Sequence, residues 1–355
     1  MHQIFLESHH LKNKNFGFGQ FNYHLIKEML RYSPNDFQFT IHAKNIASAK
    51  KDFGTHPKYK PYYSLRRKRF FQIRKKYDLW HSLNQNTKIE PYHDLPYLLT
   101  IHNTSRIKDP ESYKHLDSFK RLQSKINRST AITYISHFAK KATHEFYEIP
   151  NIPEYVIYNG NTLQDSTIPT DFQSDFRIKK PFLFSIGQIT KRKNFGSLVK
   201  MLRHLPDFQL VIAGKKTTEE AQEIQKLIKN SNLEDRISLP GKISTEQKKY
   251  FYKHCEAFVF PSFREGFGLP LVESMNFGTP IFASKNTSLP EIGGEQAFYW
   301  NNFDPEEMSE KLLDGLNQFY KNPEFYRQKL QERSQLFSWS KAAKQYLDVY
   351  ENLLK

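Results

Sequence analysis

The sequence lacks the patterns that mark several classes of protein. It has one cysteine, Cys255, in 355 residues, so no disulfide can form within the chain. No apolar run approaches the roughly 18 residues that span a bilayer. The N-terminal "MHQIFLESHH" turns polar too early for a signal peptide. These absences predict a cytoplasmic protein, either soluble or bound peripherally to the inner face of a membrane.

Patterns for metal binding are also missing. The chain contains no Asp-x-Asp pair, and its His and Cys residues do not show the spacing of metal ligands. A phosphorylated ligand would therefore have to be held by basic side chains and backbone N–H groups. We expect no metal site and no cofactor.

Acidic residues are scarce in the first half of the chain. The formal net charge is +16, and residues 1–170 hold 26 Lys/Arg against 14 Asp/Glu, whereas the remainder holds 27 against 23. Such a one-sided positive field favours an acidic partner, which can be anionic lipid, nucleic acid or a phosphorylated substrate. The alternative interpretation is a generally basic, solvated surface.

Strand-like and helix-like segments alternate along the chain, which is typical of parallel sheets covered by helices. A polar stretch at 161–180 lacks periodicity and separates two such series. We predict an α/β protein of two domains, with a ligand cleft at the carboxyl ends of the strands. The segments lie at 3–6, 21–32, 37–43, 77–83, 97–103, 119–136 and 155–160, and then at 181–187, 195–205, 208–214, 219–231, 236–241, 246–255, 257–262, 269–278 and 280–284.

Two glutamates flank a glycine loop in "FPSFREGFGLPLVESMNFGTP", residues 260–280. Pro270 is suited to the first turn of a helix, so we predict a strand, a loop that carries Glu265, and a helix that carries Glu273. The open N–H groups of such a helix start attract anions. Because carboxylates would repel a phosphate, we expect the two glutamates to face hydroxyl groups, such as those of a sugar.

Basic residues follow another strand and glycine in "PFLFSIGQITKRKNFGSLVKML". Arg192 and Lys193 come just before a predicted helix, where cations are unfavourable unless an anion shares the site. Arg can hold two phosphate oxygens and Lys supplies a point charge. The segment therefore predicts a phosphate site near Gly187, with a solvated basic loop as the alternative.

Two features of the first half point to a ligand as well. Gly17 and Gly19 precede an amphipathic helix and permit close approach of a ligand to the backbone. Asn22 stands where the dinucleotide fingerprint needs a third glycine, which disfavours a dehydrogenase. His102 ends an apolar strand, from which it could donate to a sugar hydroxyl or a phosphate oxygen.

Taken together, these segments resemble the retaining glycosyltransferases of family 4, the group 1 enzymes with a Glu-x7-Glu motif. The resemblance runs over nearly the whole chain and implies the GT-B fold of two facing Rossmann-like domains with an interdomain cleft. It implies an acceptor domain at 1–168, a nucleotide-sugar domain at 169–336 and a helix at 337–355 that crosses back to the first domain. The matching segments are "FGFGQ", "LLTIHN", "AITYISHFAKK", "YVIYNGN", "SIGQITKRKNF", "LVIAGKK", "ISLPGKIS" and "FPSFREGFGLPLVESMNFGTPIFAS".

The resemblance also implies roles for individual residues. Glu265 would lie against the donor sugar, and Glu273 would bind the ribose hydroxyls. His102 would contact the sugar or assist departure of the phosphate. The remaining residues would surround the diphosphate and sugar: Gly17, Gly19, Gly187, Arg192, Lys193, Gly266, Phe267, Gly268 and Leu269.

The implied reaction transfers a hexose, with mannose as one candidate, from a GDP- or UDP-sugar to a saccharide or lipid-linked acceptor, with retention and without metal. Many members carry Arg after the strand glycine, whereas Gln188 follows Gly187 here; the "KRKN" run is similar to a subgroup that includes mannosyltransferases. Such an enzyme would serve the synthesis of cell-surface polysaccharide or lipopolysaccharide. The alternatives are another GT-B sugar enzyme, such as a phosphorylase or epimerase, and a basic nucleic-acid-binding protein, for which no binding motif is present.

A basic patch occupies residues 64–76 of the predicted acceptor domain. It interleaves aromatic residues, among them Phe70 and Phe71, with cations and has no acid before Asp78. Basic residues beside aromatics suit an anionic membrane surface or an acceptor attached to one, and a solvated loop is the alternative. The cations are Arg66, Arg67, Lys68, Arg69, Arg74, Lys75 and Lys76.

Overall fold

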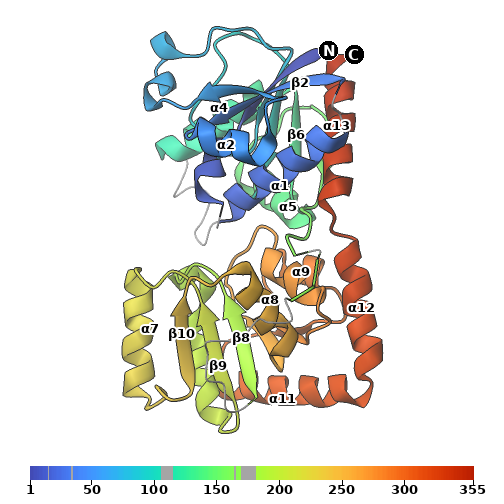
Figure 1. Cartoon of the computed structure of the whole chain (residues 1–355). Coiled ribbons are helices and arrows are strands. Elements are labelled where there is room, and N and C mark those ends of the chain that lie inside the picture. The colour runs from blue at the N-terminus through green and yellow to red at the C-terminus, as the bar shows by residue number, and fades with distance from the viewer. Residues whose placement is uncertain (15, 33–34, 105–114, 164, 169–180) are drawn as a thin grey trace. The chain divides into compact units, whose positions relative to one another are not determined.

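The computed structural model describes all residues of the chain except 15, 33–34, 105–114, 164 and 169–180 (Figure 1). It consists of two compact units, Met1–Gly160 with Ser338–Lys355, and Asn161–Phe337. The division falls eight residues before the predicted boundary at 168. Asn161 already belongs to the second unit, because its amide donates to the Phe337 carbonyl (3.0 Å) and its side chain to Ser334 Oγ (3.0 Å).

The first unit is built on a seven-stranded sheet in the order β3-β2-β1-β4-β5-β6-β7, in which every pairing is parallel. Its central strands are buried along their whole length, as expected for a parallel sheet covered on both faces. The strands are β1 (His2–Glu7), β2 (Phe37–Ala43), β3 (Lys58–Pro61), β4 (Leu79–Ser82), β5 (Tyr97–Ile101), β6 (Ala131–Tyr134) and β7 (Glu154–Val156).

Helices of the first unit bury one apolar stripe each. In α1 (Gly17–Tyr32) the buried stripe includes Leu25 and Met29, and α13 (Trp339–Leu354) packs against this helix. The other helices are α2 (Ile46–Phe53), α4 (Asp117–Arg128) and α5 (His137–Phe146), with the short 3-10 helices η1 (His9–Asn13), η2 (Ser64–Arg67) and η3 (Arg69–Phe71).

The second unit has a six-stranded parallel sheet in the order β10-β9-β8-β11-β12-β13. Its strands are β8 (Phe182–Ile186), β9 (Gln209–Ala213), β10 (Ile237–Gly241), β11 (Ala257–Phe260), β12 (Ile281–Ser284) and β13 (Phe298–Trp300). Its helices are α6 (Phe195–Met201), α7 (Glu219–Asn230), α8 (Thr245–His254), α9 (Leu269–Met275), α10 (Leu289–Gly293), α11 (Pro305–Lys321) and α12 (Pro323–Gln335), with η4 (Lys191–Lys193) and η5 (Leu202–His204).

Both sheets have the doubly wound strand order. Counted within its own unit, each runs 3-2-1-4-5-6, and the first unit adds a seventh strand at one edge. The order reverses between β1 and β4 in the first unit and between β8 and β11 in the second. Ligands of such folds bind beyond the carboxyl ends of the strands at this switch point. The topology therefore singles out the segments after β1 and β4, and after β8 and β11.

Candidate active site

The segments after β8 and β11 bring three charged side chains together in the second unit. η4 follows β8 and carries Arg192 and Lys193, while Glu265 lies in the loop between β11 and α9. Lys193 Nζ donates to Glu265 Oε1 over 2.7 Å, and Arg192 Nη1 lies 3.1 Å from the same oxygen. The two cations and the glutamate, predicted from separate motifs, thus form one cluster at the switch point.

Lys193 is the buried cation of this cluster. Its side chain is 8% exposed, against 40% for Arg192, and its ammonium group lies 4.4 Å from the centre of the Phe260 ring. Burial lowers the pKa of Lys193, and the adjacent Glu265 carboxylate partly offsets that effect. A Cβ on residue 187 would come within 3.0 Å of Lys193 Cε, so Gly187 makes room for the lysine side chain.

The donors that contact the Glu265 carboxylate meet at one of its two oxygens. Lys193, Arg192 and the Ser262 hydroxyl, at 2.7 Å, all contact Oε1. Burial on its own would raise the pKa of Glu265, but the charges of Lys193 and Arg192 outweigh it and lower the pKa below its ordinary value. The cluster therefore holds two positive charges and one negative charge. Its net charge of +1 attracts an anion.

The loop after Glu265 is shaped by its glycines and by Ser288. Gly268 has φ +110°, and a Cβ there would lie 2.9 Å from a methyl group of Leu289. The Ser288 hydroxyl lies 3.0 Å from the carbonyl oxygen of Glu265 and 2.9 Å from that of Phe267. The ring of Phe267 is buried against Phe337, 5.6 Å between ring centres. The Phe267 side chain therefore packs inside the protein, and Leu269 begins α9.

Glu273 is buried in α9 and is held by three donors. Lys248 Nζ (2.8 Å) and the Thr162 hydroxyl contact Oε1, and the Tyr252 hydroxyl contacts Oε2 (3.0 Å). A carboxylate offers about four acceptor positions, so these donors use most of its capacity. The assignment of Glu273 to ribose hydroxyls stays a prediction, and a ribose would have to share the carboxylate with protein donors.

Several of these partners were not predicted from the sequence. Lys248 and Tyr252 stand four residues apart on α8, so both face Glu273 from one side of the helix. That spacing was visible in "KKYFY", but nothing in the sequence tied it to a glutamate 21 residues away from Tyr252. Ser262 follows β11 by two residues, the usual position for a polar residue at a strand end, and was also missed.

In the first unit, His102 follows β5 directly and is buried between Phe18 and Phe21, whose rings meet it edge to face at 4.8 and 4.5 Å. Its Nε2–H donates to the Leu83 carbonyl over 2.9 Å. Burial lowers the pKa of His102 to about 4, so the ring is neutral and Nδ1 carries a lone pair. The sequence predicted a donor at this position, whereas the structure supplies an acceptor at Nδ1.

The early glycines occupy different positions from those predicted. We placed Gly17 and Gly19 in a loop before the helix, but α1 begins at Gly17 and includes Gly19. A Cβ on residue 19 would lie 2.0 Å from the carbonyl oxygen of Asn13. Gly19 thus permits the helix to pack against the end of η1, and a role for either glycine toward a diphosphate stays a prediction.

The basic patch forms an exposed surface segment of the first unit. Phe70 is 75% exposed and Phe71 is 47% exposed. Arg74 lies between the rings of Phe70 (5.9 Å) and Tyr92 (5.4 Å), so guanidinium and aromatic groups share one surface. Ile73 is buried and pairs with Pro91 in an isolated bridge, which anchors the segment.

The described part of the chain also bears on metals and membranes. Across residues 1–355, outside the undescribed positions, no three His, Cys, Asp or Glu side chains gather as metal ligands. Among the helices that the structure describes, none combines the length and the apolar character needed to cross a bilayer.

Comparison with known sequences finds similarity to glycosyltransferases. Residues 168–336 match the family described as "Glycosyl transferases group 1". The chain is 25% identical over 288 residues to the serotype-specific mannosyltransferase WbdA of Escherichia coli, covering 75% of this chain and 35% of WbdA. It is 30% identical over 173 residues to the O-antigen chain mannosyltransferase B of Escherichia coli, covering 47% of this chain and 45% of that protein. The chain thus spans less than half the length of these two relatives.

A third relative and two solved structures match over longer spans. The O-antigen chain mannosyltransferase RfbU of Salmonella typhimurium is 24% identical, covering 66% of this chain and 68% of RfbU. Sucrose-phosphate synthase from Thermosynechococcus elongatus superposes with a TM-score of 0.73 at 18% identity, covering 99% of this chain and 98% of the synthase. HepE of Anabaena, solved with UDP-glucose, gives 0.72 at 15%, covering 99% of both chains.

The two doubly wound units and their structural likenesses define a protein with the GT-B fold. Its residues 168–336 match the group 1 glycosyltransferases, and the mannosyltransferase relatives support the same family.

Proposed function

We propose that this chain is a retaining hexosyltransferase that moves a hexose from a nucleoside diphosphate sugar to a hydroxyl of a saccharide or lipid-linked acceptor. The names of WbdA, mannosyltransferase B and RfbU favour mannose as the hexose. Two of those names refer to O-antigen, which favours a cell-surface polysaccharide or lipopolysaccharide as the product. The nucleoside diphosphate of the donor is then GDP, for a mannose donor, or UDP, as in the HepE complex.

The observation that carries this proposal is the cluster of Arg192, Lys193 and Glu265 at the switch point of the second unit. A diphosphate would replace Glu265 as the main partner of the two cations. The negative charge that develops on the departing diphosphate would be stabilised by fixed cations, without a metal ion or a cofactor. Glu265, relieved of one cation, would turn its carboxylate toward the sugar hydroxyls.

Retention can follow from attack by the acceptor on the face that the diphosphate leaves. The bond from the anomeric carbon to the phosphate oxygen breaks, the bond to the acceptor oxygen forms, and the leaving phosphate takes the acceptor's proton. Glu265 is not the nucleophile in this mechanism, because its carboxylate would be engaged by the hydroxyls of the donor sugar. His102 would accept a hydrogen bond from a sugar hydroxyl at Nδ1. A glycosyl adduct trapped on Glu265 would contradict this mechanism.

A thermal-shift screen with UDP, GDP, ADP and TDP tests the nucleotide site. At about 100 times its dissociation constant, the correct nucleotide should stabilise the protein by about 2.7 kcal/mol. We expect Arg192→Ala or Lys193→Ala to abolish most of this shift, because each removes a phosphate-binding charge. Glu265→Gln should keep most of the shift and lose turnover of labelled nucleotide sugar.

Lys191→Ala is the matched control, because Lys191 lies in the same 3-10 helix but is exposed. It should retain the nucleotide shift. Each variant is compared with its own melting temperature without nucleotide, since loss of Lys193 also breaks a buried ion pair. The proposal is wrong if no nucleoside diphosphate stabilises the wild type, or if Glu265→Gln turns over normally.

We also propose that the basic patch holds the first unit against an anionic membrane at its cytoplasmic face. The exposure of Phe70 and Phe71 beside seven cations supports this partner, because aromatic rings enter the interface while cations contact lipid headgroups. A lipid-linked acceptor would then be presented to the enzyme at the same surface.

A further inference from the structure

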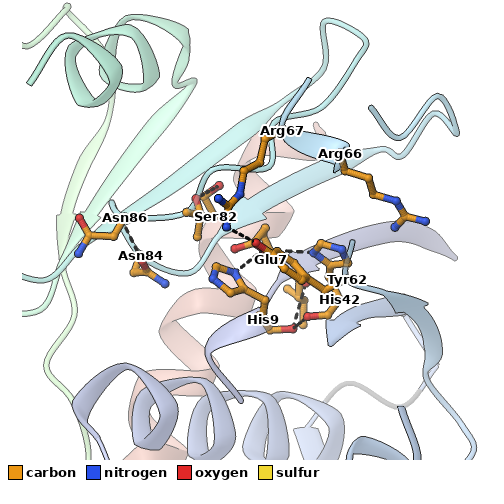
Figure 2. Close-up of polar contacts among 12 residues, drawn as sticks. Glu7, His9, His42, Tyr62, Arg66, Arg67, Ser82, Asn84 and Asn86 are labelled. Atoms are coloured by element: carbon orange, nitrogen blue, oxygen red, sulfur yellow. Dashed lines mark hydrogen bonds and ion pairs between the residues drawn. The ribbon is translucent and has the colours of Figure 1, made fainter. Parts of the chain in front are cut away.

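A second group of charged and polar side chains lies at the switch point of the first unit (Figure 2). Glu7 ends β1 and is fully buried. The strand register places it level with His42 on β2 and with Ser82 on β4. The three residues form a row across the carboxyl edge of the sheet, where ligands of doubly wound folds bind.

Two histidines donate to one oxygen of Glu7. His9 Nδ1 lies 2.8 Å and His42 Nδ1 lies 3.1 Å from Oε1. Burial on its own would raise the pKa of Glu7, but the hydrogen bonds from His42 and His9 outweigh it and hold the pKa at about 2. The carboxylate is therefore ionised at neutral pH although it is buried.

Three further polar atoms of this group are buried without a partner. Among the residues that the structure describes, Glu7 Oε2, His42 Nε2 and Asn84 Nδ2 have no hydrogen-bond partner, and all three residues are fully buried. Buried polar groups in folded proteins are normally paired, so unpaired ones mark a place where a ligand or water belongs. Here two potential acceptors and one donor are left open at the same edge of the sheet.

The chemistry of these atoms selects the ligand. The ionised Glu7 repels a phosphate or carboxylate. Arg67 reaches this group through its hydrogen bond to the Tyr62 hydroxyl (Figure 2) and disfavours a cationic ligand. A hydroxyl group both donates and accepts, so it can pair with Glu7 Oε2, Asn84 Nδ2 and His42 Nε2. A neutral compound with several hydroxyls fits all three atoms.

We propose that Glu7, His9, His42 and Asn84 form a subsite that binds hydroxyl groups of the acceptor saccharide. This inference rests on the proposed glycosyl transfer and assigns the recognition of its acceptor to named atoms: Glu7 Oε2 accepts one sugar hydroxyl, and His42 Nε2 binds a neighbouring one. His9 orients Glu7 from the opposite side.

Tyr62 covers this subsite. Its ring stacks on His9 at 4.7 Å between ring centres and lies 5.4 Å from the ring of His42. Arg67 Nη2 donates to the Tyr62 hydroxyl over 2.6 Å. Tyr62 has to swing aside before a sugar reaches Glu7, and its partner Arg67 belongs to the basic patch.

The test is binding of methyl glycosides of mannose, glucose, galactose and N-acetylglucosamine to the full chain, measured by saturation-transfer NMR with competition to obtain Kd. We expect at least one glycoside to bind the wild type. Glu7→Gln should weaken it by about 10- to 100-fold, the usual effect of losing a hydrogen bond to a charged group. His42→Asn should weaken it by about 5- to 10-fold, because Asn keeps a donor for Glu7 but lacks Nε2.

Glu154→Gln is the matched control. Glu154 lies on β7 of the same sheet and also binds a histidine, since His144 Nε2 is 2.8 Å from its Oε2. It should bind the glycoside like the wild type. If no glycoside binds the wild type, or if Glu7→Gln or His42→Asn binds as tightly as Glu154→Gln, the subsite is wrong and internal water satisfies these atoms.

The nucleotide shift separates this inference from the proposed function. Glu7→Gln and His42→Asn should keep the full stabilisation by the nucleoside diphosphate, because neither residue is among those proposed to bind it. Absence of that shift in the wild type contradicts the proposed function, whatever the glycosides do. His42→Asn alone decides the inference if Glu7→Gln does not fold.

Discussion

Two buried histidines of the first unit, His81 and His102, are held in the neutral form. His81 lies on β4, where Thr100 Oγ1 is 2.7 Å from Nε2 and the Tyr350 hydroxyl is 2.6 Å from Nδ1. Burial lowers the pKa of His81 to about 3 and that of His102 to about 4. Both rings can be protonated freely only when the chain unfolds, so proton binding opposes folding at these residues.

This gives a pH dependence with a definite sign. Below the ordinary histidine pKa of 6.5, the unfolded chain takes up protons that the native state does not. We expect the free energy of unfolding to fall by about 1.4 kcal/mol per pH unit for each of these histidines as the pH drops from 6.5 toward 4. Glu7 adds to the loss only below its ordinary pKa of 4.5.

Urea unfolding at pH 7, 6 and 5 measures this slope. His81→Gln should reduce this slope by about 1.4 kcal/mol per pH unit, the contribution of one proton, because the buried ring that resists protonation is gone. The exposed His56 serves as the control, and His56→Gln should leave the slope unchanged. Equal stability of the wild type at pH 7 and pH 5 would contradict the assignment of neutral buried rings.

At the level of single residues, the sequence predicted the members of the candidate active site better than their partners. Glu265, Arg192 and Lys193 stand beside glycines at strand ends, so their place at the sheet edge followed from the local pattern. The segments after β8 and β11 come together because these two strands are neighbours in the sheet. No local sequence pattern predicts that strand order. Glu7 was missed for a similar reason, since His42 reaches it from 35 residues away.

At the level of elements, the C-terminal helix α13 stabilises the first unit through buried tyrosines. The Tyr350 hydroxyl contacts His81, and the Tyr346 hydroxyl lies 3.2 Å from Thr100 and 3.3 Å from Thr133. Both tyrosines are fully buried. The helix therefore fills a polar gap over β4, β5 and β6, which its apolar periodicity alone does not reveal.

We expect Tyr350→Ala to destabilise the protein by about 3–5 kcal/mol, because it leaves a large cavity and removes a partner of His81. Tyr346→Phe should cost about 1 kcal/mol, the value of a hydrogen bond. Chemical denaturation followed by circular dichroism provides the measurement. The exposed Phe325 is the control, and a cost for Tyr350→Ala no larger than that for Phe325→Ala would contradict this role of α13.

The long apolar strands were predicted correctly, whereas several other elements were not. β3 reads "KYKP" and is only partly buried, so an edge strand of this kind has no apolar run to detect. The segment 119–136 was treated as one run, but it contains α4 and β6, separated by Ser129 and Thr130. The helices α11 and α12 lie in the part of the chain for which we made no prediction, and both are built from mixed polar and apolar residues.

At the scale of the whole molecule, the net charge of +16 makes binding to surfaces dependent on salt. We expect the chain to float with vesicles that contain anionic lipid and to be released as salt rises. Replacing Arg69 and Arg74 by Glu should weaken binding in low salt, since each cation near the surface contributes about 1 kcal/mol. Phe70→Ser should reduce the fraction of protein that stays bound to the vesicles in high salt.

Phe325→Ser is the control for the aromatic change, because Phe325 is 47% exposed and lies in the second unit. It should float like the wild type. Equally weak binding to neutral and anionic vesicles would show that the basic patch is only a solvated surface.

Arg192 and Lys193, the two cations beside Glu265, differ in exposure, and this difference sets the order in which a ligand from solution would reach them. The guanidinium of Arg192 still touches water, whereas the ammonium of Lys193 is enclosed by Phe260 and the carboxylate. In the proposed function, a diphosphate arriving from solution would therefore meet the arginine first and would gain the lysine only after Glu265 moves away. Capture and final binding would then be separate steps, and the second would free the glutamate carboxylate for the donor sugar.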